Sequence, residues 1–400
     1  MQRQQQAGSG HEGERSRQHG SATQGRGGPQ AMTAPPAEAA PVRFETRPVG
    51  GGRSIGLAWL SRPRQLNALD LDMCERLLAK LGQWAGDPSM VAVFLGGDGP
   101  KGFCAGGDVT RAVREIAAGG AGRFDYGDRF FTVEYRLDYL LHTFPKPLVT
   151  WAHGVTMGGG LGLSVAGSHR LVAVGSRIAM PEIHIGLFPD VAGGWFLNRV
   201  PGEAGLLMAL TGVMLDEQDA VYARLADHVV DHSRQPEFLD GFAAIDWGDT
   251  VADHRAQATH FCRGFEAAGK PAGVRSSALR ERYEAIRSIC TRAKLHGIMK
   301  GLQEAAAVDD WFAKPLANLR EGSPTAAAVT LEYLRRCRLL GLGQVLELDL
   351  VVAKQCLRHA DFPEGVRALL IDKDKAPRWS PPTRQALSAA LVEEFFSPLP

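Results

Sequence analysis

Three consecutive glycines, Gly158 to Gly160, follow an apolar run at residues 147–152. Glycine has no Cβ, so another group can approach its backbone closely, and a helix that begins there presents unpaired N–H groups at the positive end of its dipole. A second glycine-rich corner at residues 101–108 follows the apolar run 91–95, which is typical of a buried strand. Two such corners in one fold can supply two converging N–H donors for a developing negative charge.

Strand-like and helix-like segments alternate through the first half of the chain. Asp70 is placed to cap a helix whose apolar residues fall on one face, and residues 123–142 have the pattern of a second helix. This alternation predicts a layered α/β domain. The predicted strands cover residues 54–61, 91–95, 147–152 and 170–174.

The chain divides into three predicted regions by composition. Residues 1–41 contain no Leu, Ile, Val, Phe, Trp or Tyr, so we expect a disordered tail. Residues 42–230 form the predicted α/β core, and residues 231–400 form a mainly helical C-terminal region because strand signals fade after residue 230. Helix breaks are expected near residues 269–271, 322–324 and 361–363.

Charge and cysteine content restrict the partners and the compartment. The net charge is +1, and no uncharged apolar run is long enough to cross a bilayer, so we expect neither a nucleic-acid partner nor a membrane span. Six cysteines without a C-x-x-C pair argue against a zinc or disulfide framework and favour a reducing, cytoplasmic location. The mitochondrial matrix is the weaker alternative, because Glu12 and Glu14 come early and no amphipathic apolar stripe is present.

Several motifs resemble the crotonase (enoyl-CoA hydratase/isomerase) superfamily. They are "FCAGGD" at 103–108, "TMGGGLGLS" at 156–164, "MPEIHIGLFPDVAGG" at 180–194 and "EGVRA" at 364–368, and the second and third look specific to the acyl-CoA hydrolase branch. The resemblance leaves only about the first forty residues uncovered. It implies a spiral of ββα turns followed by a helical C-terminal region, a choice that composition alone could not make over a doubly wound sheet.

The resemblance also implies the roles of five residues. The backbone N–H groups of Gly107 and Gly159 would form the oxyanion hole, and Glu182 would act as nucleophile through a mixed anhydride or as base for water. Asp190 would engage the substrate hydroxyl or the attacking water, and Glu134 would contact the acyl group. Two carboxylates in one pocket push their pKa values apart, so one can be ionised while the other holds a proton.

An exchange of carboxylates separates this chain from the hydratases it resembles. Hydratases of the superfamily carry a second catalytic glutamate where this chain has Gly162, and they have glycine where this chain has Asp190. The implied reaction is hydrolysis of a short 3-hydroxyacyl-CoA, with 3-hydroxyisobutyryl-CoA of valine breakdown as the expected substrate. CoA is then part of the substrate, and no cofactor or metal is expected. A homo-oligomer is compatible with the sequence.

Two other functions stay open from the sequence. An enoyl-CoA isomerase or hydratase of the same superfamily can use a glutamate at position 182, although Asp190 would then lack a clear role. A non-catalytic acyl-CoA-binding protein would keep the pocket without turnover. Only the hydrolase liberates free thiol from an acyl-CoA ester.

Three reactive side chains in or near these motifs are expected to have no catalytic role. His184 is expected to line the pocket or to be structural, and Cys104 is expected to be packed in the core. Ser164 lies in a near match to the G-x-S-x-G elbow, but the last position is alanine and the serine falls inside the predicted helix. A serine-hydrolase mechanism is therefore not supported.

Overall fold

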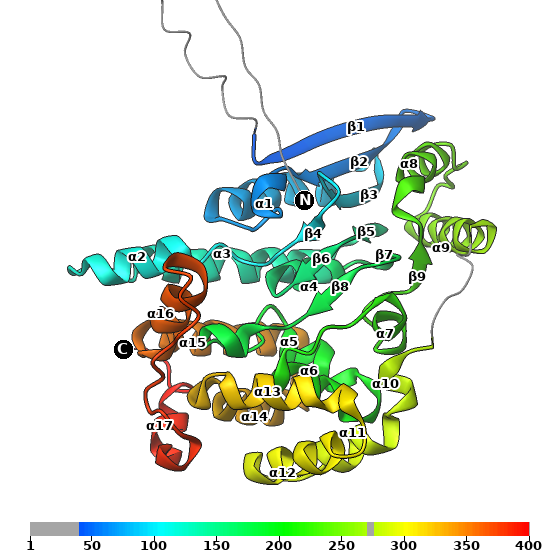
Figure 1. Ribbon diagram of the computed structural model, residues 1–400. Helices are drawn as coiled ribbons and strands as arrows, with labels where there is room; N and C mark the ends of the chain where they lie inside the picture. The colour runs from blue at the N-terminus through cyan, green and yellow to red at the C-terminus, as the bar shows by residue number, and fades with distance from the viewer. Residues whose placement is uncertain (1–39, 270–275, 400) are drawn as a thin grey trace, which may run out of the picture. The chain divides into compact units, whose positions relative to one another are not determined.

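The computed structural model describes residues 40–269 and 276–399, which are built on two β-sheets (Figure 1). The larger sheet has six strands and begins with an antiparallel pair, β1 and β2, before continuing in parallel. Its strands, in spatial order, are β1 (Val42–Gly50), β2 (Arg53–Leu60), β3 (Met90–Gly97), β5 (Leu148–Ala152), β7 (His169–Ala173) and β9 (His228–Val230). The smaller sheet contains β4 (Gly102–Cys104), β6 (Val155–Met157) and β8 (Arg177–Ala179).

The chain winds as a spiral in which each turn gives one strand to each sheet. β3 is followed by β4, β5 by β6, and β7 by β8, and the members of each sheet pair in parallel. This is the expected spiral of ββα turns. All four strands predicted from the sequence are present, with ends that differ by at most two residues.

The parallel strands of the six-stranded sheet, from β2 to β9, are mostly buried on both faces, which explains their nearly continuous apolar sequences, whereas the edge strand β1 is largely exposed or half-buried. Successive side chains of a strand point to opposite faces, so Ile55 and Leu57 pack against α8 (Gln235–Ala243) and α9 (Val251–Ala268), whereas Ala58 and Leu60 join the main core. Figure 1 shows α8 and α9 beside the sheet. The second core is strongly aromatic and contains Trp59, Phe94, Trp151, Phe238 and Phe242.

Two helices of the core carry or flank the glycine corners. α1 (Leu71–Gly86) begins at the predicted cap, because the Asp70 side chain accepts a hydrogen bond from the Met73 N–H at 2.9 Å. α4 (Gly159–Val165) begins inside the glycine triplet and is buried along its whole length. The predicted helix at 123–142 is α3 (Asp125–His142), which packs against α1.

The described part of the chain after residue 230 contains helices and no strand, as expected. The predicted break at 322–324 separates α13 from α14, whereas residues 361–363 open α16, so the break there lies just before them. The helices beyond α9 are α10 (Ala278–Glu281), α11 (Tyr283–Cys290), α12 (Leu295–Ala306), α13 (Ala313–Glu321), α14 (Pro324–Cys337), α15 (Leu342–Arg358), α16 (Asp361–Val366) and α17 (Ala389–Glu394).

Some predictions lie beyond what the structure describes. The tail at 1–41 falls almost entirely outside the described residues, and so does most of the break at 269–271. The division of the ordered part at residue 230 stays a prediction. None of the helices within 40–269 and 276–399 is long and apolar enough to span a membrane.

Candidate active site

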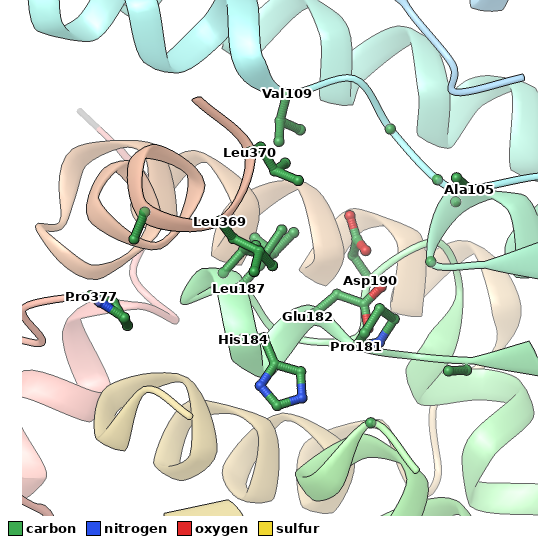
Figure 2. A pocket seen from close by; sticks show the side chains of 18 of the residues that line it. Ala105, Val109, Pro181, Glu182, His184, Leu187, Asp190, Leu369, Leu370 and Pro377 are labelled. Carbon is green, nitrogen blue, oxygen red and sulfur yellow. The ribbon is translucent and has the colours of Figure 1, made fainter. Parts of the chain in front are cut away.

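A cavity of about 600 Å³ brings together all five residues that the sequence singled out. Gly107, Glu134, Gly159, Glu182 and Asp190 line it, although they come from four separate parts of the chain. Figure 2 shows Glu182 and Asp190 next to each other on one wall. The segment after α16 forms the opposite wall, where the side chains of Leu369 and Leu370 face the cavity (Figure 2).

The two glycine corners place two backbone donors near each other. Leu69 forms a parallel bridge with Gly107, in which Leu69 donates to the Gly106 carbonyl and accepts from the Asp108 N–H. These two bonds leave the N–H of Gly107 itself outside the bridge. Gly159 is the first residue of α4, so its N–H has no acceptor within the helix.

The distances from a Cβ atom built on Gly159 show how close this glycine lies to Gly107 and Glu134. A Cβ on Gly159 would lie 3.5 Å from the Gly107 nitrogen and 2.7 Å from Oε1 of Glu134. Within the described residues, neither N–H donates a hydrogen bond to a backbone or side-chain acceptor. Both N–H groups are therefore free to donate to a ligand in the cavity.

Glu182 enters the cavity from a short turn that follows β8. It is the first residue of the 3-10 helix η2 (Glu182–Ile185), which ends at Gly186 in the left-handed region. The side chain is buried, and its Oε2 atom has no hydrogen-bond partner within the described structure. Burial, followed by the nearby charge of Asp190, raises the pKa of the Glu182 carboxyl well above its ordinary value.

Asp190 is the better stabilised of the two acids. The Tyr135 hydroxyl donates a hydrogen bond of 2.6 Å to Oδ2 of Asp190. Burial raises the pKa of Asp190 to about 6, and the Tyr135 hydrogen bond acts in the opposite direction. The charge of Asp190 in turn contributes to the raised pKa of Glu182. No sequence motif marked Tyr135 as a partner of Asp190.

Glu134 points into the cavity from the middle of α3. Its side chain is 2% exposed, and its Oε1 atom has no hydrogen-bond partner in the described residues. Asp138 follows one helical turn later, fully buried and also without a partner for either oxygen. Burial raises the pKa values of both carboxyls well above the ordinary range, and the charge of Asp190 adds to the effect. The free Glu134 oxygen is available to a polar group of a ligand.

The position of the missing second glutamate is filled by another residue. A Cβ on Gly162 would lie 2.7 Å from the Cβ of Val191. Val191 directly follows Asp190, so the residue that closes one carboxylate position belongs to the same turn that supplies the other carboxylate. The two positions of the carboxylate exchange thus lie next to each other in the structure.

The three side chains expected to have no catalytic role lie as predicted. His184 lines the cavity wall, and burial followed by the charge of Lys314 lowers its pKa (Figure 2). Cys104 is fully buried, and burial raises the pKa of its thiol to about 12, which disfavours a thiolate nucleophile. Ser164 is buried inside α4, where its carbonyl accepts a hydrogen bond from Thr150.

The raised pKa of the Glu134 carboxyl predicts that this residue stabilises the fold less as the pH rises. A carboxyl with a raised pKa binds its proton more tightly in the folded state, so the free energy of unfolding falls as pH rises through the window above the ordinary carboxyl value. Glu134→Gln removes one such group. We expect the variant to melt above wild type at about pH 7.5, with a smaller difference at about pH 5.

Thermal denaturation at the two pH values checks this prediction. Glu347→Gln is the matched control, because Glu347 is exposed on α15 and should change the melting temperature little at either pH. A Glu134→Gln variant that melts at or below wild type at both values would contradict the predicted cost of the buried charge.

The stacked sheets, the paired glycine donors and the buried carboxylates together define a crotonase-type fold. The family model described as enoyl-CoA hydratase/isomerase matches residues 55–396, so the chain belongs to that family. The chain is 37% identical to "3-hydroxyisobutyryl-CoA hydrolase, mitochondrial" of Gallus gallus and 36% identical to the protein of that name in Xenopus tropicalis; each match covers 86% of both chains. A solved structure titled carnitinyl-CoA dehydratase from Mycobacterium thermoresistibile superimposes with a TM-score of 0.77 at 33% identity, covering 90% of this chain and 97% of the other.

The expectation of a cytoplasmic location is wrong by this comparison. The relatives from Gallus gallus and Xenopus tropicalis are both named as mitochondrial enzymes, and both match most of the chain. The scattered cysteines indicated a reducing compartment but could not identify which one. Glu12 and Glu14 were given too much weight against a mitochondrial location.

Proposed function

We propose that the chain hydrolyses the thioester of 3-hydroxyisobutyryl-CoA, an intermediate of valine breakdown, and releases CoA. The observation that carries the proposal is the pair Glu182 and Asp190 in one cavity beside two backbone donors, with Val191 closing the position of a second glutamate at Gly162. The names of the relatives support the same substrate.

In the proposed reaction, the thioester carbonyl oxygen lies between the N–H groups of Gly107 and Gly159. Both donors strengthen their hydrogen bonds as negative charge develops on that oxygen, and each is typically worth about 3 kcal/mol in the transition state. The carbon–sulfur bond then breaks, and CoA leaves as a thiolate that takes up a proton. The unpartnered oxygen of Glu134 can accept a hydrogen bond from the acyl end.

Glu182 acts at the carbonyl carbon by one of two routes. It attacks directly and forms a mixed anhydride that water later opens, or it removes a proton from a water molecule that attacks. Both routes require an ionised Glu182, and a pKa raised by burial makes its carboxylate a stronger base than an exposed one. Asp190 then orients the attacking water or holds the substrate hydroxyl.

The packing around Asp190 distinguishes this proposal from the isomerase or hydratase alternative. A two-glutamate hydration needs a second carboxyl near position 162, and the Val191 side chain leaves no room for one. An isomerase that used Glu182 alone would give Asp190 no task, although Asp190 is buried in the cavity and held by Tyr135. A non-catalytic binding protein would have no need for the buried carboxyls of Glu182 and Asp190, because burying such groups lowers the stability of the fold.

The wild-type protein is therefore expected to hydrate crotonyl-CoA at a negligible rate while releasing thiol from 3-hydroxyisobutyryl-CoA. Asp190→Gly, which restores the residue of the hydratases, should lower thiol release by at least about a hundredfold without creating hydratase activity. The loss of enoyl absorbance and the release of thiol measure the two reactions in parallel. Rapid hydration by wild type, with Asp190→Gly unchanged in thiol release, would favour the alternative.

A further inference from the structure

The turn that carries Asp190 has a strained backbone. Val191 has a φ of 51° and Ala192 a φ of 65°, so two consecutive residues with side chains occupy the left-handed region. Such residues keep this conformation only where the surrounding structure holds them there. The contacts of this turn therefore decide where the Asp190 carboxylate lies.

A buried carboxylate on a C-terminal helix holds the turn. Asp349 of α15 is fully buried, and its Oδ2 atom accepts a hydrogen bond of 2.8 Å from the Ala192 N–H. Its other oxygen accepts a hydrogen bond from the hydroxyl of Tyr333 on α14. That hydroxyl in turn accepts a hydrogen bond of 2.8 Å from the Gly194 N–H. The N–H groups of Ala192 and Gly194 thus both donate to one clamp, formed by Asp349 and Tyr333.

The opposite side of the turn is fixed by packing and by one further hydrogen bond. Val191 lies against Gly162 of α4, and the Gly193 N–H donates to the Asp190 carbonyl at 2.7 Å. The turn is therefore held between the helix that supplies the oxyanion donor and the helices α14 and α15. Asp349 lines no part of the cavity, so it does not reach a substrate.

We propose that Asp349 is a positioning residue for Asp190, which it fixes opposite Tyr135 by clamping the Val191–Ala192 turn together with Tyr333. The inference rests on the proposed hydrolysis, because it assigns Asp190 a role in that reaction. It also gives the C-terminal helical region a task at the site. Asp349→Asn replaces one of the two accepting oxygens with a donor, so either the Ala192 N–H or the Tyr333 hydroxyl proton loses its acceptor.

The test compares Asp349→Asn with Asp219→Asn. Asp219 serves as the control because it is also buried and accepts two hydrogen bonds, from Ser277 and from Leu279, yet it does not line the cavity. Both of these bonds end on Oδ1, so Asp219→Asn can keep them, and we expect it to lose less thermal stability than Asp349→Asn. Only Asp349→Asn should lower kcat for thiol release, by at least about tenfold, while KM changes less than about threefold, because the substrate contacts stay in place.

A second variant and a crystal structure keep the inference testable if Asp349→Asn does not fold or if wild type is inactive. If Asp349→Asn does not fold, Tyr333→Phe removes only the hydroxyl of the clamp and should lower kcat by at least about threefold. Equal kcat losses in the Asp349 (or Tyr333) and Asp219 variants would overturn the inference. If wild type itself releases no thiol, the proposed function fails instead, and a crystal structure of the Asp349 or Tyr333 variant decides the positioning role. If Val191 and Ala192 keep their positive φ values in that variant structure, the positioning role of Asp349 is overturned.

Discussion

Glu182→Gln is expected to reduce thiol release from 3-hydroxyisobutyryl-CoA by at least about a thousandfold. Glutamine fills the same volume at the start of η2, but its amide can neither attack the carbonyl carbon nor remove a proton from water. The substrate should still bind, because the glycine donors and Glu134 are unchanged. The rate of thiol release and the dissociation constant of the substrate, measured on the same preparation, check the two parts of this prediction.

The control for this substitution is again Glu347→Gln, which makes the same chemical change at an exposed position of α15. It should retain the wild-type rate. A Glu182→Gln variant that keeps more than about a tenth of wild-type activity would show that another group delivers the attack.

Gly159→Ala is expected to have the second of the two largest effects, a loss of at least about a hundredfold. The added methyl carbon would lie 2.7 Å from Oε1 of Glu134 and 3.5 Å from the Gly107 nitrogen. It therefore fills the space between the two donors where the carbonyl oxygen has to lie. Because the neighbouring Glu134 side chain can move, we expect the fold to tolerate the change.

Gly264→Ala is the matched control for this variant. Gly264 lies in α9 with nothing within 4 Å of a built Cβ, so alanine there should leave activity unchanged and raise helix stability by about 0.5–1 kcal/mol. Gly158→Ala would be a poor control, because Gly158 has a φ of 52° and its Cβ would lie 2.8 Å from Oε1 of Glu182. Thiol release of Gly159→Ala within about threefold of the control would place the oxyanion hole elsewhere.

The sequence predicted well what short segments determine by themselves. The apolar runs became strands because each is buried on both faces, and Asp70 capped its helix because the cap needs only residues three apart. Four of the five site residues could be selected because each lies in a short motif, whereas Glu134 was implied only by the resemblance to the hydrolase branch. Their convergence on one cavity depends on how the two sheets stack, and no single motif predicts that stacking.

The parts that sequence reasoning missed depend on contacts between distant segments. Tyr135 looked like a core aromatic, and only the fold brings its hydroxyl to Asp190, 55 positions later. Asp349 lies 157 positions after Ala192, on a helix whose pattern gives no sign of a buried acceptor. The contact between Val191 and Gly162 likewise depends on tertiary packing. Each is a contact that secondary-structure periodicity cannot predict.

The most direct test of the central claim is the release of free thiol from 3-hydroxyisobutyryl-CoA by the full wild-type chain, with equal amounts of acetyl-CoA and crotonyl-CoA in parallel reactions. The account predicts stoichiometric release of CoA and 3-hydroxyisobutyrate, with a kcat/KM at least about a hundredfold above that for acetyl-CoA, which lacks the hydroxyl that Asp190 and Glu134 can bind. Thiol release at background level, with conversion of crotonyl-CoA to its hydrated product, would contradict it.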